Sequence, residues 1–180
     1  MKYLIDGLDY QQFPIPKYDK SEIIGNILAT GLFVIQWLYF LIKYYHLPES
    51  IPVQFNLEGQ PEQYGNKTTL FVFPGVMTLI VVILTILERF PDRFKYSLRL
   101  DENNAPTVYK YARKFIIYMK IVTCALFLFL ISQMISVVNL KSKPKEMYFC
   151  FLFVPVYLFG VFVYFRYMKI IQNRQKKVTI

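Results

Sequence analysis

The stretch "TTLFVFPGVMTLIVVILTIL", residues 68–87, decides the fold class of this 180-residue chain. Thirteen of its residues are Leu, Ile, Val or Phe, and none is charged. At roughly −0.4 kcal/mol each, these residues favour insertion into a bilayer by a free energy on the order of −5 kcal/mol. A helix of this length covers about 30 Å, which is the thickness of the hydrocarbon core. The stretch therefore predicts a transmembrane helix.

Three other apolar blocks have a similar length, at about residues 23–42, 115–138 and 147–168. Four such blocks leave too little remaining sequence to bury them in a soluble core. We therefore expect an all-α integral membrane protein, a single domain over residues 1–180 that forms a bundle of four transmembrane helices. Apart from Arg166 near the end of the fourth block, Lys120 is the one charged residue inside the blocks. We expect its side chain to snorkel to the headgroups, with a functional buried charge as the alternative.

The distribution of basic residues predicts the orientation of the chain. Fifteen Lys and Arg residues lie before the first block, between the second and third, and at or after the end of the fourth, whereas five lie in the other two loops. This asymmetry places both termini in the cytoplasm and the first loop outside. The formal charge of +9 is thus a topology signal, and we expect no nucleic-acid partner, because the basic residues do not share one water-exposed face.

A helix start is predicted near Ala105, where a run of capping residues meets a proline. Lys110, Arg113 and Lys114 follow within the next turns. We expect this basic turn to contact anionic headgroups before the third helix enters the membrane.

The first loop, "HLPESIPVQFNLEGQPEQYGNK" at residues 46–67, contains more residues that restrict the backbone than a flexible linker requires. Its prolines stiffen the chain, and Asn56–Gly59 is typical of a turn. Ile51, Val53 and Phe55 alternate with polar neighbours, so we expect them to pack against the end of the bundle. Two interpretations stay open: a compact structural cap on the helix ends, or a binding surface for an outside ligand.

No pattern in the sequence indicates an active site. His46 is the only histidine, and the two cysteines, Cys124 and Cys150, lie inside apolar blocks. No zinc-protease motif and no glycine-rich phosphate loop occurs. We therefore expect no catalytic residue, no metal site and no cofactor, and we do not expect an enzyme.

The first loop resembles the signature of a bacterial membrane family, domain of unknown function 1648. The family pattern is Leu-Pro-acid-x-Ile-Pro-x-His-aromatic-Asn-x-x-Gly-x-Pro-Asp, followed by Gly-Ser-Lys. The positions that match it are Leu47, Pro48, Glu49, Ile51, Pro52, Phe55, Asn56, Gly59, Pro61, Gly65 and Lys67. The departures are Gln54 for the histidine, Glu62 for the aspartate and Asn66 for the serine. Tyr96 and the acidic stretch at 101–105 also resemble family members.

This resemblance implies a multi-pass protein of the bacterial inner (plasma) membrane. The same domain occurs in the SdpI immunity proteins, which resist a secreted toxic peptide. The implied function is a non-enzymatic immunity or sensor protein that recognises an extracytoplasmic peptide ligand through residues 47–67. The alternative is a small transporter or channel component, as a homo-oligomer in the lipid bilayer. The candidate ligand-binding residues are Leu47, Pro48, Ile51, Pro52, Phe55, Asn56, Gly59, Tyr64 and Lys67.

Overall fold

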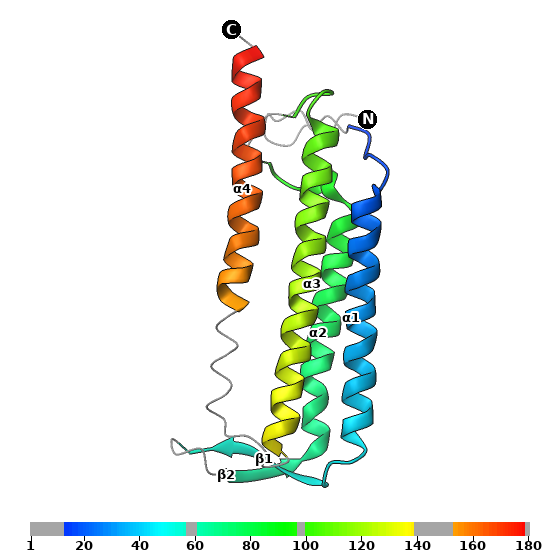
Figure 1. The fold of residues 1–180 in the computed structure, drawn as a ribbon, viewed down its shortest axis with the longest axis vertical. Helices are drawn as coiled ribbons and strands as arrows, with labels where there is room; N and C mark the ends of the chain where they lie inside the picture. The colour runs from blue at the N-terminus through cyan, green and yellow to red at the C-terminus, as the bar shows by residue number, and fades with distance from the viewer. Residues whose placement is uncertain (1–12, 57–60, 97–99, 139–152, 179–180) are drawn as a thin grey trace.

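Four helices run alongside one another in the computed structural model, which describes residues 13–56, 61–96, 100–138 and 153–178 (Figure 1). The helices are α1 (Lys20–Tyr44), α2 (Val72–Arg89), α3 (Ala105–Val138) and α4 (Phe153–Val178). Between α1 and α2, strands β1 (Ser50–Phe55) and β2 (Pro61–Asn66) form an antiparallel hairpin. A 3₁₀ turn, η1 (Lys67–Phe71), leads into α2, and a second, η2 (Pro91–Arg93), follows it.

All four helices are long and apolar enough to cross a membrane. The prediction of an all-α, four-span fold is therefore confirmed, with the small hairpin as an addition. Helix α1 extends beyond the expected span 23–42 at both ends, because its capping residues lie outside the apolar block. Helix α4 continues well past the expected end at 168, and residues 147–152 of that span lie outside the described residues.

The hairpin lies at one end of the bundle, here called the hairpin end (Figure 1). Helix α1 begins, α2 leads into α3, and α4 ends at the opposite end, here called the terminal end. This arrangement follows from a chain that crosses the bundle four times. The assignment of the terminal end to the cytoplasm stays a prediction from the charge distribution.

Helix α3 is the central element, and α1, α2 and α4 each pack against it. Its 34 residues reach about 51 Å, so it extends beyond the hydrocarbon core. Glycines permit the close approaches: a Cβ atom at Gly25 of α1 would lie 2.6 Å from Cγ2 of Ile117. A Cβ at Gly160 of α4 would collide with the Tyr118 ring.

Polar residues fix where two of the helices begin. The Asp19 carboxylate accepts from the backbone N–H of Glu22 at 2.8 Å, and the Glu22 carboxylate accepts from the backbone N–H of Asp19 at 2.7 Å. This reciprocal capping box starts α1. Asp101 and Asn104 form a similar pair of side-chain-to-backbone bonds before α3. The predicted start of the third helix near Ala105 is confirmed.

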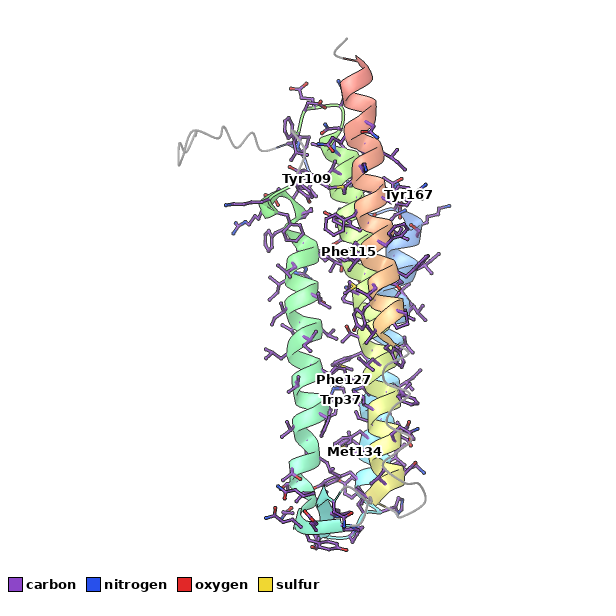
Figure 2. All side chains as sticks on the ribbon, turned by 90° about the vertical axis from the view of Figure 1, so that its left-hand side faces the viewer. Trp37, Tyr109, Phe115, Phe127, Met134 and Tyr167 are labelled. Atoms are coloured by element: carbon purple, nitrogen blue, oxygen red, sulfur yellow. The ribbon has the colours of Figure 1, made fainter. Side chains whose placement is uncertain are left out.

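Aromatic and aliphatic side chains fill the hairpin half of the bundle, where Figure 2 labels Trp37, Phe127 and Met134. The Trp37 indole Nε1–H donates to the Thr78 hydroxyl at 3.2 Å and so links α1 to α2. The buried cluster at the hairpin end consists of Phe40, Leu47, Ile51, Leu70, Ile131, Ile135 and Val138. Two of these residues belong to the first loop, so the hairpin is packed onto the bundle rather than held apart from it.

Candidate functional site

The motif residues of the first loop divide into an inner and an outer set. Leu47 and Ile51 are buried in the cluster at the hairpin end and hold the hairpin against α1, α3 and the turn η1. Lys67 closes the base of the hairpin. Its ammonium forms an ion pair with Glu49 at 2.9 Å and donates to the Leu47 carbonyl oxygen at 3.4 Å. It also lies 5.0 Å from the centre of the Tyr44 ring. Leu47, Ile51 and Lys67 thus fix the hairpin to the end of the bundle.

The outer set faces away from the bundle. Tyr64 lies opposite Pro52 in the strand register, and 60% of the Tyr64 residue surface is exposed. Pro48 is exposed as well, while Pro52 and Asn56 are half-buried. The side chain of Phe55 and the residue Gly59 lie outside the described part of the chain. The turn predicted at Asn56–Gly59 largely falls there too.

One packing prediction for the loop is wrong. Ile51 is buried as expected, but Val53 is 41% exposed. The register shifts between Pro52 and Gln54 in β1, so Val53 is an extra residue with no partner in the register on β2. Such a bulge interrupts the strict alternation of inward and outward side chains. Val53 instead covers Gly65, where a Cβ atom would lie 2.9 Å from Cγ1 of Val53.

A cluster of buried charges lies among α1, α2 and α3 toward the terminal end, and its central member is Lys120. The Lys120 ammonium forms an ion pair with Glu88 of α2 and donates to the Asn26 amide oxygen of α1. The Asn26 amide in turn donates to the other Glu88 oxygen at 2.7 Å. Lys120 is 4% exposed and Glu88 is 2% exposed. The expected snorkelling of Lys120 is therefore wrong, because buried Glu88 and half-buried Asn26 hold its ammonium inside the bundle.

A second buried ion pair joins α3 to the start of α1. Arg113 is 1% exposed, and its Nε–H donates to the Glu22 carboxylate at 2.9 Å. Its remaining N–H groups bond the backbone oxygens of Pro16 and Lys17, and its guanidinium lies 4.5 Å from the centre of the Tyr18 ring. Arg113 was expected to contact headgroups, and this expectation is wrong: the guanidinium binds the protein's own N-terminal segment.

Tyr18 connects the two buried pairs. Burial, then the charge of Glu88 and a hydrogen bond to that carboxylate, raise the pKa of Tyr18 above its ordinary value. A shallow cavity of about 370 Å³ lies beside it, lined by Tyr18, Ile23, Asn26, Ile27 and Thr30. Asn26 therefore borders this cavity on one side and contacts the Lys120–Glu88 pair on the other. Sequence reasoning missed both buried ion pairs because Glu22 and Glu88 each lie one residue outside the expected spans.

Deeper in the bundle, Gln36 of α1 is fully buried, and neither polar atom of its side chain has a hydrogen-bond partner among the described residues. The described residues hold no group of three or more His, Cys, Asp or Glu side chains placed to bind a metal ion. His46 is exposed in the turn after α1.

This architecture is that of a multi-pass α-helical membrane protein. Residues 31–78 match the family model DUF1648, described as a domain of unknown function. The matched segment runs from the middle of α1 through the hairpin into α2, so the resemblance predicted from the first loop is confirmed. The resemblance predicted for the second loop lies outside this match and stays a prediction.

The chain is also similar to an uncharacterized protein of Archaeoglobus fulgidus, with 30% identity over 76 residues. This similarity covers 42% of the present chain and 40% of the archaeal protein, so less than half of each is compared. No solved structure matches the chain.

Proposed function

We propose that this membrane protein is a non-enzymatic sensor or immunity protein, which recognises an extracytoplasmic peptide through the outer face of the β1–β2 hairpin. The observation that supports this proposal most is the division of the hairpin into a fixed inner side and an exposed outer side. Buried Leu47 and Ile51 and the paired Lys67 immobilise the hairpin. Little conformational entropy is therefore lost when a ligand binds to exposed Tyr64.

The position of the hairpin also supports this proposal. The excess of basic residues in the other segments predicts that the hairpin end is the extracytoplasmic one. Tyrosine offers a large apolar ring with one polar tip, which suits contacts to peptides. SdpI-like immunity, the finer form of the proposal, rests on the motif resemblance in the first loop.

The test uses survival of cells in medium conditioned by peptide-secreting cells of the same species. We expect cells that carry the protein to survive better than cells from which its gene is deleted. Tyr64→Ala is expected to remove the protection at unchanged protein level. Tyr45→Ala is the matched control, because Tyr45 is 80% exposed at the same end but lies outside the hairpin. Equal protection by the wild type and Tyr64→Ala contradicts the proposal.

A second candidate function is a small transporter or channel component, as a homo-oligomer. The buried cluster of Asn26, Glu88 and Lys120 favours it, because charged residues inside membrane spans often mark ion or substrate pathways. Liposomes that contain the protein would then conduct protons or monovalent cations under an imposed gradient. A flux equal to that of protein-free liposomes would argue against this candidate and leave the peptide proposal untouched.

A further inference from the structure

A groove of about 440 Å³ lies between α3 and α4. It is lined by residues of α4 between Phe159 and Tyr167 and, from α3, by Tyr111, Lys114, Phe115 and Tyr118. We call it the α3–α4 groove. It runs along the part of α4 that lies between two buried residues. Among the described α4 residues, Gly160 and Met168 alone are buried, and eight residues of helix separate them by about 12 Å.

The floor of the groove is aromatic. The rings of Tyr111 and Tyr167 stack at 4.8 Å between centroids, and those of Phe115 and Tyr164 stack at 4.7 Å. Figure 2 shows Tyr167 nearer to the terminal end than Phe115. The Tyr118 ring, beside Gly160, continues the floor about one turn deeper. The groove is thus lined by aromatic rings from the terminal end into the membrane-spanning part of both helices.

The rim of the groove toward the terminal end is basic. Lys114 lines the groove, and 38% of its side-chain surface is exposed. Its ammonium shares the Asp19 carboxylate with Lys110, at 3.1 Å for Lys114 and 2.7 Å for Lys110. One carboxylate neutralises only one of two ammonium groups. One positive charge therefore remains at this rim, and the longer contact leaves Lys114 the more available of the two lysines.

From this combination of charge and shape we infer that the α3–α4 groove binds one anionic phospholipid from the leaflet at the terminal end. The phosphate contacts Lys114 at the rim, and an acyl chain lies along the rings of Phe115, Tyr164 and Tyr118. Both walls belong to helices that can span a membrane, so the groove opens sideways toward lipid rather than toward bulk water. A lipid satisfies both parts of the groove at once, because its charged head and its apolar chain are joined in the same order as the rim and the floor.

The inference is tested by native mass spectrometry of the full-length protein, released from nanodiscs that contain equal amounts of phosphatidylglycerol and phosphatidylcholine. The measured quantity is the ratio of retained phosphatidylglycerol to retained phosphatidylcholine. Lys114→Gln removes the charge at the rim. Lys20→Gln is the matched control, because Lys20 is an exposed lysine at the same end and does not line the groove. Val163→Trp places a large side chain into the groove.

We expect the wild type and Lys20→Gln to retain phosphatidylglycerol preferentially. Lys114→Gln should lower the ratio by about fivefold, which corresponds to about 1 kcal/mol for one lysine against an anionic headgroup. Val163→Trp should lower the retention of both lipids. Equal retention of the two lipids by the wild type, or equal ratios for Lys114→Gln and Lys20→Gln, would overturn the inference. Unchanged retention in Val163→Trp would overturn the placement of the acyl chain.

Discussion

Replacing Lys120 by methionine tests whether the buried charge cluster holds the bundle together. Methionine keeps most of the length of the side chain and removes its charge, so Glu88 loses its cationic partner while 2% of its surface is exposed. Breaking a buried ion pair by removing one partner costs about 3–5 kcal/mol, because the remaining charge stays buried and uncompensated. The Asn26 amide oxygen loses its donor as well. We therefore expect Lys120→Met to lower the free energy of unfolding by about 4 kcal/mol.

The double variant Lys120→Met/Glu88→Leu distinguishes two costs: the loss of the attraction between Lys120 and Glu88, and the burial of an unpaired Glu88 charge. Replacing both partners of a buried pair by apolar residues is often neutral or stabilising. Asn26 alone is then left with unmet hydrogen bonds, at a cost of about 1–3 kcal/mol. The double variant should accordingly be more stable than Lys120→Met by about 1–3 kcal/mol.

The assay is unfolding of the purified protein by a titration with sodium dodecyl sulfate, followed by circular dichroism. Lys20→Met serves as the control, because Lys20 is exposed and its replacement should change the free energy of unfolding by less than about 0.5 kcal/mol. If Lys120→Met unfolds like the Lys20 control, or if the double variant is less stable than Lys120→Met, the cluster does not carry the stability assigned to it.

Three further predictions concern packing and capping, and thermal unfolding in detergent measures each. Gln36→Met should raise stability by about 1–2 kcal/mol, because it removes a buried amide without partners; a loss would indicate that the amide has a partner, such as ordered water. Gly25→Ala should cost about 1–3 kcal/mol through its clash with α3, whereas Gly75→Ala, with open space at its Cβ, should be tolerated. A hydrogen bond from Lys110, then bonds from neighbouring groups, hold the pKa of Asp19 far below its usual range. A depressed carboxyl pKa stabilises the fold above about pH 4, so stability should fall as the pH drops below that value, and less so in Asp19→Asn.

The sequence was sufficient for the fold because burial in lipid requires long apolar helices. The blocks at 68–87 and 115–138 lie within α2 with its preceding turn and within α3. Ala105 could be recognised as a helix start because Asp101 and Asn104 are capping residues. These features depend on neighbouring residues and on composition, which a single sequence reports directly.

The buried charges could not be predicted because they depend on which helices meet. Glu88 follows the last apolar residue of its block, and a hydropathy boundary at Leu87 assigns it to the loop. Helix α2 continues to Arg89 and brings Glu88 against Lys120, which is 32 residues away in the sequence. The bulge at Val53 could not be predicted either, because the register of β1 is set by its pairing with β2. Of the candidate ligand residues, the sequence could not separate buried Leu47 and Ile51 from exposed Tyr64.

The measurement that tests the central claim most directly is thiol labelling of intact cells with a membrane-impermeant maleimide. Glu62→Cys at the exposed surface of β2 and Lys95→Cys at the terminal end are each placed in a background in which Cys124 and Cys150 are replaced by serine. Four membrane spans with an extracytoplasmic hairpin predict that Glu62→Cys is labelled in intact cells and that Lys95→Cys is labelled only after permeabilisation. The reverse pattern, or labelling of both in intact cells, would contradict the account.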